Sequence, residues 1–121
     1  MNSLILIIDT AHPTARVVLV SEKKVLGLRE WENTPKVGTD VLENIEGLLL
    51  ECGKALQDIT RVAVHSGPWS FGLLRTGIGT AATLAQTLHA ELVETCGDTV
   101  EEMVDAAQNA TPVASIEPKY T

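Results

Sequence analysis

The sequence predicts an α/β fold with a single lobe, built from a five-stranded mixed sheet and flanking helices. Short aliphatic runs bounded by turn residues indicate buried strands. Longer segments with apolar residues every three or four positions indicate amphipathic helices. The chain has 121 residues, which is the size of one domain. We expect the lobe over residues 1–108 and an extended tail over residues 109–121.

The first three predicted elements are strands that form an antiparallel meander. Residues 4–8 are a continuous aliphatic run, and residues 15–22 are rich in β-branched side chains. Pro13 lies in the turn between them, where its fixed φ is favourable. Residues 25–32 follow a short polar turn and complete the meander, because strands joined by short turns pair antiparallel.

A first amphipathic helix is predicted over residues 40–52. Asp40 and Glu43 are spaced as a capping box, and Gly53 is a suitable terminator. The apolar stripe of this helix consists of Val41, Ile45, Leu48, Leu49 and Cys52.

The second half of the chain alternates strands and helices. Residues 61–66 and 90–94 read as short strands, and residues 70–90 read as a helix of small residues that Ser70 begins. Thr99 and Glu102 predict a capping box for a last helix over residues 98–107. The order is therefore three strands, helix, strand, helix, strand, helix.

Composition limits the class of partner. The net charge is −7, which repels nucleic-acid backbones. There is no long basic run, and the apolar N-terminal run is too short for a signal peptide or a membrane span. We expect a cytoplasmic protein without membrane contact, with Cys52 and Cys96 as reduced core thiols.

The stretch from Gly67 to Ala90 raises the possibility of a nucleotide site. Gly77, Gly79 and Ala82 match G-x-G-x-x-A, but they come a dozen residues after the strand, where the dinucleotide fingerprint does not occur. A P-loop would need Lys-Ser or Lys-Thr where Leu73-Leu74 stand. A packing surface is the favoured interpretation, since small residues at helical spacing let another helix approach closely. The small-residue stripe is Gly77, Ala81 and Ala85.

Residues 67–77, which read GPWSFGLLRTG, resemble the signature G-P-G-S-F-T-G-L-R-I-G of the TsaB (YeaZ) family. That family takes part in making threonylcarbamoyladenosine on tRNA. The resemblance covers about residues 3 to 107. The matching residues are Gly67, Pro68, Ser70, Phe71, Leu74, Arg75 and Gly77. The sequence departs from the signature at Trp69, Gly72, Leu73 and Thr76.

The resemblance implies an actin-like (ASKHA) lobe that acts as a non-catalytic scaffold. Family members bind a TsaD-like catalytic subunit through their first two helices and can form homodimers through the same surface. A TsaE-like ATPase belongs to the same machinery, and the resemblance implies that this protein contacts tRNA only indirectly. Members are about twice as long, so the resemblance leads us to expect one lobe in these 121 residues and not most of a second. Carried onto this chain, the interface residues are Val41, Ile45, Leu48, Leu49, Gly77, Ala81 and Ala85, and the signature-loop residues are Gly67, Pro68, Ser70, Phe71 and Arg75.

An alternative is a remnant nucleotide-binding lobe of an actin-like phosphotransferase. In that case Asp9 and Thr10 would face phosphate, although Pro13 removes a backbone donor from the same loop. A structural role for Asp9 at the end of its strand is favoured. His12, His65 and His89 lack the H-x-x-x-H spacing of the metal site in the catalytic relative. We therefore expect no catalytic residue, no metal and no cofactor.

Overall fold

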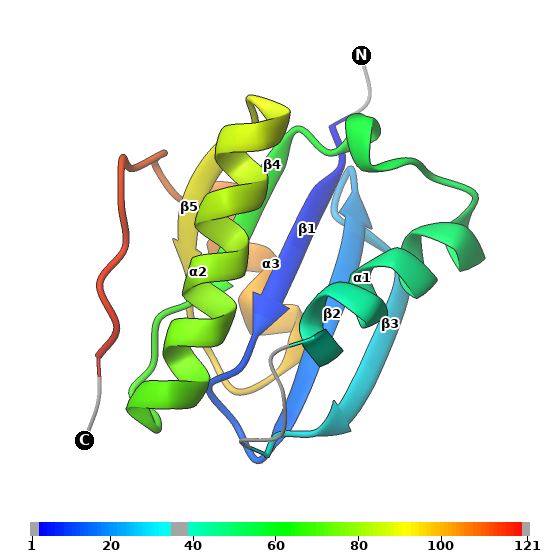
Figure 1. Ribbon diagram of the computed structural model, residues 1–121. Coiled ribbons are helices and arrows are strands. Elements are labelled where there is room, and N and C mark those ends of the chain that lie inside the picture. The colour runs from blue at the N-terminus through cyan, green and yellow to red at the C-terminus, as the bar shows by residue number, and fades with distance from the viewer. Residues whose placement is uncertain (1–2, 35–38, 120–121) are drawn as a thin grey trace.

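A computed structural model describes residues 3–34 and 39–119. It contains five strands in one sheet, three α-helices and one short 3₁₀ helix (Figure 1). The elements are β1 (Ile5–Asp9), β2 (Thr14–Ser21), β3 (Lys24–Glu32), α1 (Thr39–Cys52), η1 (Leu56–Asp58), β4 (Arg61–His65), α2 (Phe71–Leu88), β5 (Glu91–Thr95) and α3 (Val100–Asn109).

The sheet is mixed, with the strand order β3-β2-β1-β4-β5. β2 pairs antiparallel with both β1 and β3, whereas β4 pairs parallel with both β1 and β5. Central strand β1 is shared by the two halves, since Ile7 lies opposite Val18 on one side and Ala63 on the other. The predicted fold class, order of elements and meander are confirmed.

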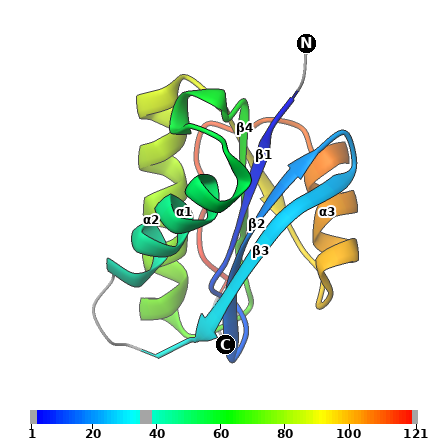
Figure 2. The ribbon, with the colours of Figure 1, turned by 90° about the vertical axis from the view of Figure 1, so that its right-hand side faces the viewer.

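Helices cover both faces of the sheet, so its central strands are buried on both sides. In Figure 2, α1 and α2 lie on one side of the sheet and α3 lies on the other. Along β1, Leu6 and Ile8 join the core under α1 and α2, while Ile5 and Ile7 join the core under α3. This double burial explains why the strand sequence is continuously aliphatic rather than alternating.

The helix ends follow local sequence signals in most places. Thr99 accepts a hydrogen bond from the Glu102 amide, and the Glu102 carboxylate accepts one from the Thr99 amide, which confirms this capping box. Gly53 has φ +66° just after α1, as a helix-ending glycine should. By contrast, α1 begins at Thr39, so Asp40 lies inside the first turn and does not precede it. Ser70 occupies the N-cap position of α2 without a side-chain capping bond.

Both cysteines are free, but only one lies close to the core. Cys52 is half-buried at the end of α1, and burial is the main cause that raises the pKa of its thiol. Cys96 is exposed, so the prediction of two core thiols is wrong for this residue. It comes directly after β5, where the chain leaves the sheet. Among the described residues, none of the helices is long and apolar enough to cross a membrane.

Candidate functional site

The residues predicted to contact a partner are buried inside this chain. All seven belong to the interior under α1 and α2, and the prediction that they form an exposed ridge is wrong. They are Val41, Ile45, Leu48, Leu49, Gly77, Ala81 and Ala85. Each helix turns its strongest apolar stripe toward its own sheet, because the sheet presents the largest apolar surface for it to cover.

Gly77 shows most directly why these positions are small. A β-carbon added at Gly77 would overlap the Thr10 side chain. The absence of a side chain therefore lets α2 pass close to the end of β1, an approach that a larger residue would block. The small stripe on α2 serves contact between this helix and the sheet of the same chain.

A different set of residues lies on the outer side of the two helices. Leu50 is 82% exposed and Leu42 is 44% exposed on α1. On α2, β-carbons added at Gly72 and Gly79 would meet no atom within 4 Å, and Ala82 is exposed. We call Leu42, Leu50, Gly72, Gly79 and Ala82 the α1–α2 outer face.

This outer face combines apolar side chains with nearly bare helix backbone. Exposed leucines are unremarkable one at a time. A glycine inside a helix, however, destabilises the helix by about 1 kcal/mol relative to alanine. Gly77 has a packing reason within the chain, whereas Gly79 has none among the described residues.

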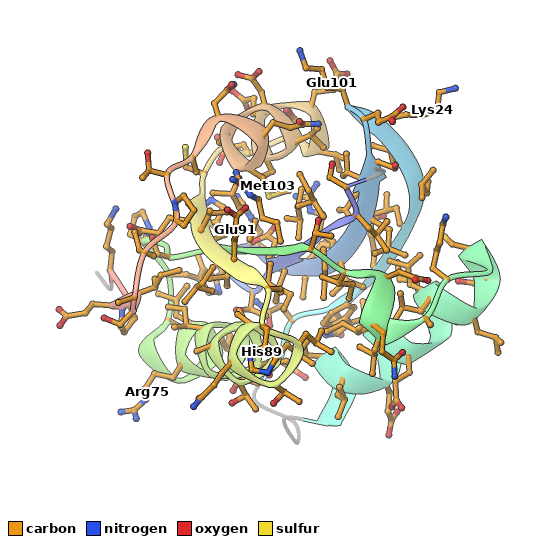
Figure 3. All side chains as sticks on the ribbon, turned by 90° about the horizontal axis from the view of Figure 1, so that it is seen from above. Lys24, Arg75, His89, Glu91, Glu101 and Met103 are labelled. Atoms are coloured by element: carbon orange, nitrogen blue, oxygen red, sulfur yellow. The ribbon has the colours of Figure 1, made fainter. Side chains whose placement is uncertain are left out.

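The signature loop connects the end of β4 to the start of α2. Gly67 has φ +107°, a conformation that favours glycine. Pro68 and Ser70 are exposed, and Arg75 projects outward from α2 (Figure 3). The Trp69 side chain packs against the core, and its amide donates a hydrogen bond to the Lys119 carbonyl at 3.2 Å. The Phe71 side chain lies outside the described part of the structure.

A second group of polar residues gathers where the three parallel strands end. Asp9 is fully buried at the end of β1. One of its oxygens accepts the Ala11 amide at 2.9 Å, and the other lies 2.7 Å from His12 Nδ1 and 3.2 Å from Arg16 Nε. The Asp9 carboxylate is therefore engaged by three groups of its own chain, as a structural acid would be. Beside it, the Thr10 hydroxyl is buried and has no hydrogen-bond partner among the described residues.

His12 and His65 link this strand end to the loop before α3. His12 Nε2 lies 3.1 Å from Asp98 Oδ1. His65 Nδ1 accepts the Gly67 amide at 3.1 Å, which leaves the proton on Nε2, 3.0 Å from the Gly97 carbonyl. Burial is the main cause that lowers the pKa of His65, with the Asp9 carboxylate opposing it. A neutral His65 is thus held between two backbone groups, which is a structural role.

The chemistry of this cluster is that of a closed network. Its histidines and carboxylates contact one another, through the His12–Asp9 and His12–Asp98 pairs. Within residues 3–34 and 39–119, no group of three His, Cys, Asp or Glu side chains is placed to hold a metal ion. The cluster joins the ends of β1, β4 and β5 and contacts the signature loop through the hydrogen bond that His65 accepts from the Gly67 amide.

Comparisons with known proteins show to which family the chain belongs. Residues 39–115 match the family model described as TsaD, tRNA N6-adenosine threonylcarbamoyltransferase. The chain is 34% identical over 86 residues to the tRNA threonylcarbamoyladenosine biosynthesis protein TsaB of Bacillus subtilis (strain 168). It also superposes on the structure of YeaZ from Pseudomonas aeruginosa with a TM-score of 0.71 and 26% identity, over 77% of this chain. The chain belongs to the TsaB (YeaZ) family.

The chain spans less than half the length of the TsaB-family relatives that it matches. It spans 37% of the length of the Bacillus subtilis TsaB and 43% of the Pseudomonas aeruginosa YeaZ chain. A second structure, of an uncharacterized protein with similarity to peptidase YeaZ from Pseudomonas aeruginosa, matches with a TM-score of 0.69, 28% identity and the same coverage. The family resemblance is confirmed, and the fold is consistent with one actin-like lobe.

The sequence contains only a weak signal for the α1–α2 outer face. Leu50 lies outside the predicted apolar stripe of its helix, but one leucine outside a stripe does not by itself indicate a partner surface. Gly79 lies two residues after Gly77 and outside the predicted small-residue stripe, so it is not among the predicted interface residues. Only the rotation of each helix on the sheet separates the inner residue from the outer one.

Proposed function

We propose that this chain is a non-catalytic subunit of the cytoplasmic machinery that makes threonylcarbamoyladenosine on tRNA. It binds a TsaD-like catalytic subunit through the α1–α2 outer face. The observation that carries the proposal is that Leu50 is 82% exposed on this face and that the space beside Gly79 is open among the described residues. The name of the Bacillus subtilis relative and the description of the matching family model support the pathway.

The physical argument starts from helix packing. Bare backbone at Gly72 and Gly79 lets a partner helix approach α2 closely, and Leu50 supplies apolar area that association would remove from water. Exposed Glu43 and Glu46 lie on α1 beside this apolar area. A partner with basic residues at the rim of its own apolar patch would be electrostatically complementary.

The proposal includes a homodimer, a TsaE-like ATPase and an indirect contact with tRNA. Without the catalytic subunit, two copies of the chain pair through their outer faces as a homodimer. A TsaE-like ATPase joins the assembly as a further subunit. The net charge of −7 keeps this subunit from attracting tRNA by itself, so tRNA is bound by the complex and not by this chain alone.

A non-catalytic role also agrees with the group of polar residues at the ends of β1, β4 and β5. A phosphate group that approached the end of β1 would meet the Asp9 carboxylate, whose partners His12 and Arg16 are already engaged. Titration with ATP and Mg²⁺ should therefore leave the melting temperature unchanged. A rise of several degrees that disappears in the Asp9→Asn variant would favour the alternative, a remnant nucleotide-binding lobe.

The decisive experiment measures binding to the TsaD-like protein of the same cell by calorimetry. Leu50→Asp and Gly79→Arg should each weaken binding by at least ~10-fold, since each places a charge in an apolar contact. The matched controls are Leu28→Asp and Asp105→Arg. Both positions are exposed, and Leu28 pairs with Val18, which belongs to the core on the α3 side of the sheet.

Circular dichroism should show that all four variants keep the native fold. The proposal is wrong if the unmodified chain and the TsaD-like protein do not associate at tens of micromolar. It is also wrong in its choice of surface if the controls weaken binding as much as the outer-face variants do.

A further inference from the structure

The C-terminal segment of residues 111–119 runs as an extended peptide along the edge of the lobe, beside β5 and α2 (Figure 1). The Val113 amide donates to the Leu92 carbonyl on β5 at 2.8 Å. Further along, the Lys119 amide donates to the Ser66 carbonyl at 2.7 Å, and the Lys119 carbonyl accepts the Trp69 amide. The segment is thus attached at both of its ends by main-chain hydrogen bonds.

The signature loop is shaped to receive this main chain. Ser66 and Trp69 offer one acceptor and one donor to the same residue, Lys119, as neighbouring strands do. Between them, Gly67 lacks a side chain where the Lys119 carbonyl lies, and a β-carbon there would overlap that carbonyl. The Ser66 hydroxyl donates to Glu94 at 2.7 Å, and Lys119 Nζ lies 3.9 Å from the same carboxylate. These contacts recognise mainly the backbone of the bound segment. The positive charge of Lys119 adds a weaker contact with Glu94.

The segment itself has the properties of a peptide ligand. Pro112 and Pro118 restrict φ and favour extended backbone in the residue before each of them. Ile116 is buried in the core under α1 and α2, while the side chains from Pro112 to Ser115 are exposed. The attachment therefore consists of one apolar side chain and a few backbone hydrogen bonds.

We propose that the β5 edge and the Ser66–Trp69 loop form a binding site for an extended peptide, which the chain's own C-terminal segment occupies reversibly. The preferred ligand has an aliphatic residue three positions before the residue that bridges the loop, and a basic side chain at that bridging position. Ordering the segment loses backbone entropy at every residue, and only Ile116 is buried in return. Its release therefore leaves the sheet and helices folded, as a local opening of low free energy.

This site is formed by other residues than the α1–α2 outer face, and its occupancy does not depend on the proposed catalytic partner. The first test is native-state hydrogen exchange on the full chain. The amides of Val113, Lys119 and Trp69 should exchange together, at least ~100-fold faster than those of central strand β1, because local opening exposes them without global unfolding. If these three amides exchange only with global unfolding, the segment is an integral part of the core and the proposal is wrong.

The second test uses a matched pair of variants in the full chain. Ile116→Asp should abolish protection of the same three amides while those of β1 stay protected. Ser115→Asp places the same charge one residue away at an exposed position and should change nothing. A synthetic peptide of residues 111–119, added to Ile116→Asp, should restore protection at the Trp69 amide, and the same peptide carrying the Asp substitution should not.

Three results would overturn the proposal. Loss of protection throughout the sheet in Ile116→Asp would show that the segment is required for folding. Failure of the peptide to restore protection at millimolar concentration would show that no separable site exists. Protection that depends on protein concentration, together with a dimer in sedimentation, would show that the segment of a second copy is the occupant.

Discussion

Gly77 on α2 lies so close to Thr10 at the end of β1 that a β-carbon on the glycine would overlap the threonine side chain. The contact sets how near the helix comes to the sheet. It also identifies the inner side of α2, because every residue of the small stripe shares that side. Gly79, on the outer face that we propose binds a partner, has open space on another side of this helix.

Replacement of two glycines of α2 by alanine should change the free energy of unfolding in opposite directions. Gly77→Ala should lower the free energy of unfolding by ~1–3 kcal/mol, because the added methyl group overpacks the contact with Thr10. Gly79→Ala should raise it by up to ~1 kcal/mol, since alanine is the better helix former and has open space at this position. Urea unfolding of the two variants measures both effects, and equal losses would contradict the assigned rotation of α2.

Two apolar residues of α1 form a second matched pair. Ile45 is fully buried and Leu50 is largely exposed. Ile45→Ala should lower the free energy of unfolding by ~2–5 kcal/mol through lost burial and a cavity. Leu50→Ala should change it by less than ~0.5 kcal/mol. Thermal unfolding should be measured at low protein concentration, because a homodimer would bury Leu50 and make its contribution to stability larger. A large loss of stability in Leu50→Ala at low concentration would show that Leu50 supports the monomer.

His65 should make stability fall on mild acidification. Burial lowers the pKa of His65 below its usual value of 6.5 in the folded chain. Below pH 6.5 the unfolded chain therefore binds a proton that the folded chain does not, and this binding favours unfolding. The stabilisation is fully present above pH 6.5 and is lost as pH falls toward the lower folded value.

Denaturant unfolding at pH 7.5 and pH 5.5 tests this expectation. The decrease in stability between the two values should be smaller in His65→Gln than in the unmodified chain. His89→Asn serves as the control, because His89 is exposed at the end of α2, and it should retain the full decrease. A decrease of the same size in all three proteins would assign the pH dependence to other groups.

Arg61 should contribute more to the stability of the fold than Arg29 does. Arg61 Nη1 donates to the carbonyls of Ala107 and Ala110 at 2.8 and 3.0 Å, and so holds the end of α3 against β4. Arg61→Met should lower the free energy of unfolding by ~1–3 kcal/mol by leaving these acceptors unpaired. Arg29→Met removes only a surface ion pair with Glu51 and should cost under ~1 kcal/mol. Calorimetric melting would rank the two, and a larger loss for Arg29→Met would contradict the assignment.

Local patterns predicted the elements well because each depends on nearby residues. The aliphatic run of residues 4–8 became β1, and Thr99 with Glu102 capped α3 as expected. The tail was predicted to be extended, and the structure adds that Ile116 anchors it while Val113 stays partly exposed. Tyr120, near the end of the predicted tail, lies outside the described residues.

The sequence by itself determined the mixed α/β fold, the order of its elements and the family signature at Gly67 to Gly77, because these follow from periodicity, capping and turn residues close together in the chain. Only the tertiary structure decided which stripe of each helix faces the sheet. Ile45 and Leu50, or Gly77 and Gly79, are equally apolar or equally small, and a helix presents such neighbours on different sides. The choice between inside and outside depends on contacts with strands far away in the sequence, and here those contacts bury the stripe that was expected to meet a partner.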